Sequence, residues 1–194
     1  MHPLINIVQK SVSLTEEEVA ATLYFFQEKK YKRNEILLRA GEVAHHVYFV
    51  QSGGLHQFYL DEAGNERTCN FTFENEFVTD LESFSQQTRS ASSIKALEPT
   101  VCYQVNCVDL VELLKQSPAV SEFFRIVVER VASESIRRTK NLLSFSPEKQ
   151  FNELLEQRPD IFQRVPQKLI AQYLGIAPES LSRIKKRMMV AAKS

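Results

Sequence analysis

The 194 residues are 43% hydrophobic and carry 24 basic and 24 acidic side chains, a formal net charge of zero. This composition argues against a disordered chain, because it provides apolar side chains for one large core or two small ones. The neutral total hides a division, since residues 1–136 carry 12 basic and 19 acidic side chains and residues 137–194 carry 12 and 5. The resulting net charges of −7 and +7 predict an acidic module followed by one that attracts phosphate.

The cysteines and histidines show none of the spacings of a metal or redox site. Cys69, Cys102 and Cys107 are an odd number without a close pair, and the adjacent His45 and His46 would point to opposite faces of a strand. No apolar run approaches the ~20 residues that cross a bilayer, and residues 1–12 lack a secretion signal. We therefore expect a cytoplasmic protein with no bound metal and no membrane partner.

Residues 14–29 predict an amphipathic helix near the start of the sequence. Acidic residues 16–18 stand at its beginning, where the helix dipole stabilises negative charge. Its apolar face consists of Leu14, Val19, Leu23 and Phe26.

From Tyr31 to about Val108 the pattern changes to short alternating or apolar runs, broken by turn residues. Many short strands with frequent turns indicate a sandwich or barrel. The stretch LHQFYLDEAGNERTCNFTF predicts a hairpin, in which Gly64 can supply the positive φ that a tight turn requires.

Beyond Val108 the pattern becomes helical, first in DLVELLK and then in a long helix over residues 118–143 that starts at Pro118. An apolar seam with spacings of four, three and four predicts that this helix packs on another helix. The seam consists of Val120, Phe124, Val127 and Val131, and it becomes polar at Glu134 and Arg138. We interpret it as a dimerisation seam, and packing of the helix on its own domain remains the alternative.

The last segment predicts a helix-turn-helix. Ser146 and Pro147 can cap and start a preceding helix with Phe151, Leu154 and Leu155 on one side, which breaks at Arg158 and Pro159. In VPQKLIAQYLGIAPESLSRIKKRM, Gly175 can form the turn and Ala171 the close contact between two helices. The inward positions are then all apolar: Ile170, Leu174, Ile176, Leu181 and Ile184. The first helix would start near Pro166, and the second would run from Pro178 to about Met188.

This motif leaves a polar, basic outer face that predicts binding to double-stranded DNA. The candidates for reaching base edges are Glu179, Ser180, Ser182, Arg183 and Lys186. The candidates for phosphate contacts are Gln167, Lys168, Lys185, Lys186 and Arg187. The alternative is an ordinary helical pair with a solvated basic run, but the joint placement of Ala171, Gly175 and the apolar positions favours DNA binding.

Nearly the whole sequence resembles the cyclic-AMP receptor protein and fumarate-nitrate regulator (CRP/FNR) superfamily. EILLRAGEVAHHVYFVQSGGLHQFYLDEAGNER is similar to strands of that family's cyclic-nucleotide-binding β-roll, and IAPESLSRIKK stands in place of its recognition helix. The resemblance implies base contacts by Glu179 and Arg183. Pro178 stands where the family often has a further Arg, so the resemblance does not define the DNA target. The cysteine cluster of the family's iron-sulfur sensors is absent before Cys69.

The loop ENEFVTDLESFSQQTRSAS resembles the family's effector loop, in which a Gly-Glu pair holds ribose and an Arg near the end neutralises the cyclic phosphate. The resemblance makes Thr79, Asp80, Arg89 and Ser90 the candidate effector residues. Thr79 in place of Gly loses positive-φ freedom and Asp80 is one methylene shorter than Glu, so the cassette is degenerate. We expect a reshaped or vacant pocket and no cofactor, although Arg89 keeps a cyclic nucleotide conceivable.

Together these patterns predict an α+β protein with three parts: a cyclic-nucleotide-binding-like β-roll (double-stranded β-helix or jelly roll, residues 1–117), a dimerisation helix (118–143) and a helix-turn-helix domain (144–194). We expect a homodimeric transcription regulator that binds pseudo-palindromic DNA, contacts RNA polymerase and responds to an unknown small-molecule effector. The alternative is a cyclic-nucleotide-binding module that acts through protein contacts. No constellation of catalytic residues stands at workable spacing, so we do not expect an enzyme.

Overall fold

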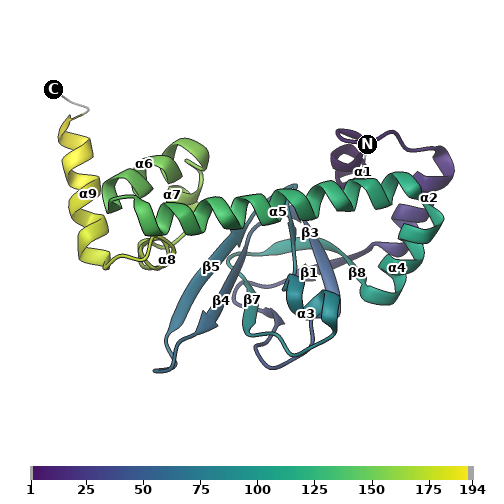
Figure 1. Cartoon of the computed structure of the whole chain (residues 1–194), viewed down its shortest axis with the longest axis horizontal. Coiled ribbons are helices and arrows are strands. Elements are labelled where there is room, and N and C mark those ends of the chain that lie inside the picture. The colour runs from purple at the N-terminus through teal and green to yellow at the C-terminus, as the bar shows by residue number, and fades with distance from the viewer. Residues whose placement is uncertain (1, 192–194) are drawn as a thin grey trace. The chain divides into compact units, whose positions relative to one another are not determined.

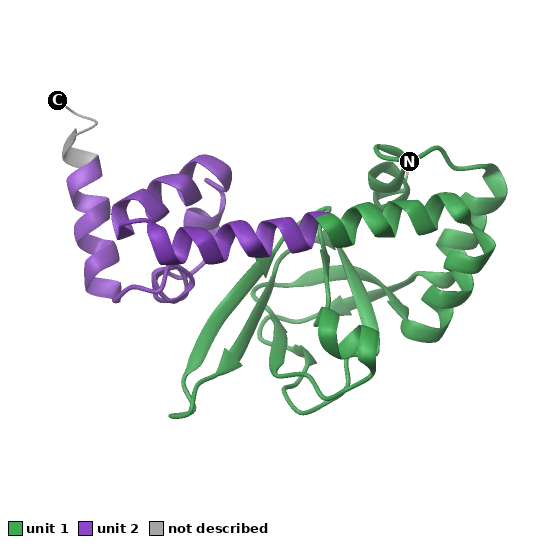
Figure 2. Ribbon diagram, in the orientation of Figure 1, with its two compact units in different colours: residues 1–129 green, residues 130–194 purple. Residues whose placement is uncertain are grey.

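The computed structural model describes residues 2–191. It has two compact units, residues 1–129 and residues 130–194 (Figure 2). Every strand described lies in the first unit, and the described part of the second is helical. The boundary falls inside one helix, α5 (Pro118–Ser144), so the segment predicted as a connecting helix contributes residues to both units. The predicted order of a β domain, a long helix and a helical domain is confirmed (Figure 1).

Two four-stranded antiparallel sheets build the β domain, in the orders β1-β8-β3-β6 and β2-β7-β4-β5. Phe49 of the first sheet and Leu55 and Ile94 of the second are at most 1% exposed and belong to one core cluster. The strands are β1 (Gln27–Tyr31), β2 (Ile36–Leu38), β3 (His46–Ser52), β4 (Leu55–Leu60), β5 (Glu66–Thr72), β6 (Phe77–Val78), β7 (Ser92–Ala96) and β8 (Thr100–Asn106).

The helices of the β domain precede, interrupt and follow the strands. They are α1 (Pro3–Gln9), α2 (Glu16–Phe25), α3 (Leu81–Gln86) and α4 (Cys107–Gln116). Thr15 starts α2 with a capping box: its hydroxyl accepts from the Glu18 amide at 3.2 Å, and the Glu18 carboxylate accepts from the Thr15 amide at 3.0 Å.

The helix predicted over residues 14–29 is too long, because α2 ends at Phe25 and residues 27–29 belong to β1. Gln27 pairs with Gln104 and Tyr31 with Thr100 on β8, so long-range strand pairing overrides the local helical pattern. Leu23, predicted to face the core, is 38% exposed. The sequence reasoning also missed α1, α3 and the four-residue α7 (Ile161–Arg164).

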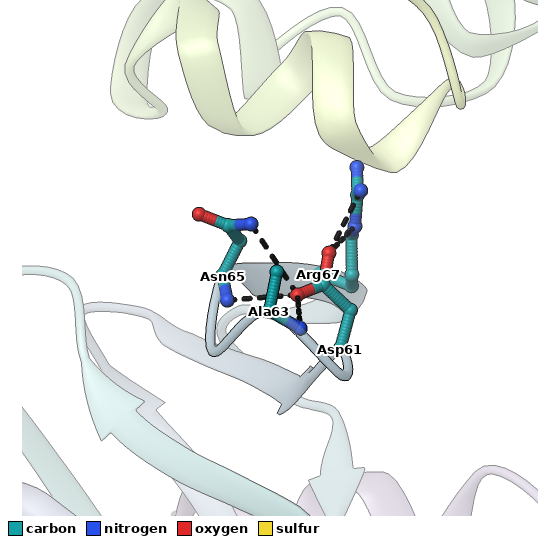
Figure 3. Close-up of polar contacts among 4 residues, drawn as sticks. All are labelled: Asp61, Ala63, Asn65 and Arg67. Carbon is teal, nitrogen blue, oxygen red and sulfur yellow. Dashed lines mark hydrogen bonds and ion pairs between the residues drawn. The ribbon is translucent and has the colours of Figure 1, made fainter.

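The predicted β4–β5 hairpin is confirmed, with Leu60 paired to Glu66. Gly64 has φ +79°, the left-handed conformation for which Gly is suited. The Asp61 carboxylate binds the turn together: one oxygen accepts from the amides of Ala63 at 3.1 Å and Asn65 at 2.9 Å, and the other from Arg67 Nε at 2.9 Å (Figure 3). The turn therefore has an Asx-type hydrogen-bond network in addition to its Gly.

The second unit contains the C-terminal part of α5 and helices α6 (Pro147–Gln157), α7, α8 (Gln167–Tyr173) and α9 (Pro178–Ala191). Ser146 caps α6 as predicted, because its side chain accepts from the Lys149 amide. Leu155, predicted to lie beside Phe151 and Leu154, is instead 38% exposed, so the apolar face of α6 is narrower than expected. Among residues 2–191, no helix is both long and apolar enough to cross a membrane.

Candidate nucleic-acid interface and effector loop

The turn between α8 and α9 closes with a Schellman motif. Gly175 has φ +67°, its amide donates to the Gln172 carbonyl at 3.1 Å, and the Ile176 amide donates to the Ala171 carbonyl at 3.0 Å. These bonds satisfy carbonyl groups at the end of α8 and turn the chain toward α9. The structure confirms the turn predicted from Gly175.

Helices α8 and α9 cross through small and branched apolar side chains. Ala171 on α8 and Leu181 on α9 are both 0% exposed, and Ile184 is 2% exposed. Ala171 is therefore buried, as the contact position predicted from the sequence requires. Ile176, also predicted to face inward, is only half-buried. The second helix begins at Pro178 as predicted but continues past Met188 to Ala191.

Most of the predicted DNA-contact residues are exposed, but not all of them. The exposed ones are Gln167, Lys168, Glu179, Ser182, Arg183, Lys186 and Arg187. Ser180 and Lys185 are half-buried, and Lys185 Nζ lies 6.0 Å from the centroid of the Phe162 ring. Arg187 forms an ion pair with Glu148 of α6. Among the described residues, Arg183 and Lys186 are thus the exposed cations of α9 that have no ion pair.

One contact that sequence reasoning missed joins α8 to the C-terminal part of α5. The Arg138 guanidinium carbon lies 3.9 Å from the centroid of the Tyr173 ring, and a terminal nitrogen donates to the Tyr173 carbonyl at 3.2 Å. In the sequence, Arg138 only marks the place where the apolar seam of α5 becomes polar. The signal that could have revealed the contact is the choice of Arg, which can stack on an aromatic ring and donate hydrogen bonds at once.

The predicted dimerisation residues on α5 differ in exposure. Val120 is 0% exposed within the core cluster of unit 1, and Phe124 and Val127 pack partly buried against that cluster. Phe124 lies 5.5 Å from Phe77, centroid to centroid. Val131 is 43% exposed. The first three side chains therefore pack within their own domain, which was the alternative interpretation, because the helix start covers the sheet edge at Phe77.

In the effector loop, Asp80 and Ser90 are brought together. Ser90 Oγ donates to one carboxylate oxygen of Asp80 at 2.6 Å, and the hydroxyl of Ser92, which the sequence did not single out, donates to the same oxygen at 2.7 Å. The other carboxylate oxygen caps α3 by accepting from the Ser83 amide at 3.2 Å. Burial opposes the charge of Asp80, but these hydrogen bonds outweigh it and hold its pKa below the ordinary value.

The other two candidate effector residues do not join this network. The Thr79 hydroxyl donates to the His46 carbonyl at 2.9 Å, so it ties the loop to β3. Arg89 is exposed, and its backbone forms a bridge with Val43. The structure thus places a carboxylate and two serine hydroxyls in the loop interior and the cation on the surface.

Comparison with known proteins finds one family model and several relatives to which the chain is similar. Residues 28–117 match the family model "Cyclic nucleotide-binding domain". The chain is 27% identical over 132 residues to the cyclic AMP receptor protein of Thermus thermophilus, which covers 68% of this chain and 60% of that protein. It is 29% identical over 168 residues to the transcriptional activator protein Anr of Pseudomonas protegens, which covers 79% of this chain and 66% of the relative.

The structure of FixK2 from Bradyrhizobium japonicum has the same fold, with a TM-score of 0.72, 15% sequence identity and 86% of each chain covered. This chain spans about two thirds or less of the length of the two curated relatives, 60% and 66%.

Proposed function

We propose that this chain is a DNA-binding transcription regulator of the CRP/FNR superfamily that acts as a homodimer. The observation that carries the proposal is the α8–α9 pair. Its apolar contact and Schellman turn are those of a helix-turn-helix, and Arg183 and Lys186 project unpaired from α9.

Glu179, Ser182 and Arg183 would read base edges in the major groove. All three are exposed, and they lie within the first two turns of α9, at spacings of three and four that place them on one face. A recognition helix contacts bases through its N-terminal residues, which is where these side chains stand. Arg183 can bind guanine with two hydrogen bonds, and Glu179 can accept from cytosine.

Lys186 and Lys168 would contact phosphate. Both are exposed, one on α9 and one in the first turn of α8, and neither has an ion pair within the described residues. A cation of this kind contributes affinity for any DNA sequence and releases bound counterions, so the contribution weakens as salt rises. The net charge of +7 over residues 137–194 supports this role.

The second half of α5 would form the dimer contact, on a face displaced from the predicted seam. Ala132, Ser135 and Thr139, at spacings of three and four, form the centre of an exposed, uncharged stripe. Its flanks are Val131 (43% exposed), Ile136 (71%), Leu142 (41%) and Leu143 (83%). Small central side chains allow two helices to approach closely. We therefore propose that a second copy of the chain covers this stripe.

In such a dimer the two copies of α9 would enter successive major grooves, about 34 Å apart on a pseudo-palindromic site. Control of transcription would follow from the position of that site relative to a promoter and from contact with RNA polymerase. Any small-molecule effector would act by changing the DNA affinity of the dimer.

The test is recovery of binding sites from fragmented genomic DNA with the purified chain, followed by titration of a recovered fragment at increasing salt. We expect enrichment of fragments with an inverted repeat and a steep, log-linear loss of affinity with salt. Absence of enrichment together with salt-independent binding would contradict the proposal.

A second candidate is a cyclic-nucleotide-binding module that acts through protein contacts, and the match of residues 28–117 favours it. Micromolar binding of a cyclic nucleotide by a chain without DNA affinity would support this candidate over the first.

A further inference from the structure

The fold family implies a cyclic nucleotide in the β domain, so the loop interior must offer hydrogen-bond donors to an anionic phosphate. Two buried side-chain donors there are the hydroxyls of Ser90 and Ser92, which are 4% and 6% exposed. Both lie within 2.7 Å of one Asp80 oxygen. Ser90 could instead donate to the Ser92 carbonyl at 2.8 Å, but the shorter bond to a charged acceptor is the stronger one.

The neighbouring polar groups are also occupied. The Ser90 amide donates to the Glu42 carbonyl at 2.8 Å, and the Ser92 amide donates to the Ser90 hydroxyl oxygen at 3.0 Å. The Ser83 hydroxyl donates to the Thr88 carbonyl at 2.5 Å and accepts from the Ala44 amide at 2.9 Å. Every donor named here thus has an acceptor within the protein.

From this arrangement we infer that the Asp80 carboxylate accepts the hydrogen bonds that the Ser90 and Ser92 hydroxyls could otherwise donate to a ligand. The effector loop is thereby closed to cyclic nucleotides. A cyclic phosphate that accepts a hydrogen bond from Ser90 would lie beside the Asp80 carboxylate. Two neighbouring negative charges in a partly buried site repel each other strongly. Arg89 could offset only part of this repulsion, because its exposed side chain is screened by water.

If the chain regulates transcription as proposed, the closed loop also determines how it responds to cyclic nucleotides. Because the loop is already ordered by its own carboxylate, the chain would bind DNA with the same affinity with and without cyclic nucleotide. A nucleotide that does not bind cannot shift the balance between two states of the protein. Closure of the loop itself does not depend on DNA binding.

The test is calorimetry and thermal unfolding of the full chain with cyclic AMP or cyclic GMP, without DNA. For the wild type we expect no binding heat and no change in Tm at about 1 mM nucleotide. Asp80→Asn removes the charge and keeps an acceptor for the Ser83 amide. We expect it to gain a measurable affinity for cyclic nucleotide, at least about tenfold above any wild-type signal, and to lose it again when Arg89→Ala is added.

Glu82→Gln is the matched control, because it removes an exposed carboxylate from the same loop. We expect this variant to bind no cyclic nucleotide. Micromolar binding by the wild type, or a folded Asp80→Asn chain without any gain, would overturn the inference. If Asp80→Asn fails to fold, the wild-type titration decides by itself. If DNA binding by the chain requires a cyclic nucleotide, the effector loop is not closed. If the wild type shows no binding of cyclic nucleotide and no binding of DNA, only the proposed function is refuted.

Discussion

Arg187 on α9 forms an ion pair with Glu148 on α6, so the last cation of the run Lys185–Arg187 is held against its own unit. A hydrogen bond from its own backbone amide and the contact with Arg187 both lower the pKa of Glu148, so it is charged at neutral pH. The pair neutralises a cation that the sequence alone presents as a phosphate contact. Under the proposed function, Glu148 would therefore reduce the affinity of the chain for DNA.

We predict that Glu148→Gln raises affinity for any DNA sequence by about two- to fivefold at low salt, because it frees Arg187 to contact phosphate. Glu156→Gln is the control, since it removes an exposed carboxylate from the same helix that has no ion pair among the described residues. Fluorescence anisotropy with a labelled duplex measures both variants. An equal gain from the two would show that only net charge matters.

Arg183 and Lys186 should have different effects on specificity. Arg183→Ala should cost about 1–3 kcal/mol on the preferred site and relax the preference at one base position. Lys186→Ala should weaken binding to all sequences alike and make the salt dependence shallower by about one counterion. Binding of both variants to a set of singly mutated sites separates these outcomes. Identical profiles would refute the assigned division between base and phosphate contacts.

Ile136→Asp should dissociate the dimer, because it places a charge in the apolar stripe of α5, where Ile136 is 71% exposed in the single chain. Ser133→Asp introduces the same charge at an exposed position on the charged side of the helix and should leave the dimer intact. Sedimentation at micromolar concentration measures the assembly of each variant. A dimer that survives Ile136→Asp would place the interface elsewhere.

The free energy of unfolding should decrease as the pH is lowered from about 7 to about 5, because of His56. This residue is 0% exposed, lies between the Phe58 and Phe71 rings, and shares a 3.0 Å hydrogen bond with Thr68. Burial, with a smaller contribution from Lys95, lowers its pKa to about 4 from 6.5. Between these two values the unfolded chain binds the extra proton, so the stability is present above pH 6.5 and lost progressively toward pH 4.

The expected loss is about 2 kcal/mol in the free energy of unfolding between pH 7 and pH 5. His56→Phe should remove this part of the pH dependence, whereas His45→Gln, which changes an exposed histidine, should keep it. Urea unfolding at the two pH values gives the measurement. A wild-type slope that persists in His56→Phe would assign the effect to other groups.

Ala171→Leu should destabilise the second unit by about 1–3 kcal/mol and abolish DNA binding, because the extra side chain has no space where α8 and α9 touch. Ala177→Leu adds the same side chain at an exposed position between the two helices and should be nearly neutral. Circular dichroism melts combined with the binding assay test both variants. Normal DNA affinity in Ala171→Leu would show that the helices do not need this close contact.

Features that arise from local backbone chemistry and from periodicity could be predicted from the order of the residues alone. Gly64 and Gly175 stand where the chain needs a positive φ, Ser146 caps a helix, and the apolar positions around Ala171 define the helix pair. Each of these signals depends on residues within a few positions of one another, so the order of elements and the helix-turn-helix could be predicted.

By contrast, contacts between side chains that are far apart in the sequence could be seen in the folded chain alone. Residues 27–29 form a strand because they pair with β8. Val120 of the predicted dimer seam is buried in the core of its own domain. Glu148 on α6 forms an ion pair with Arg187, and the Asp80 carboxylate accepts hydrogen bonds from the hydroxyls of Ser90 and Ser92. Periodicity shows which way a residue faces along its own element, but it carries no information about what the rest of the chain brings to that face.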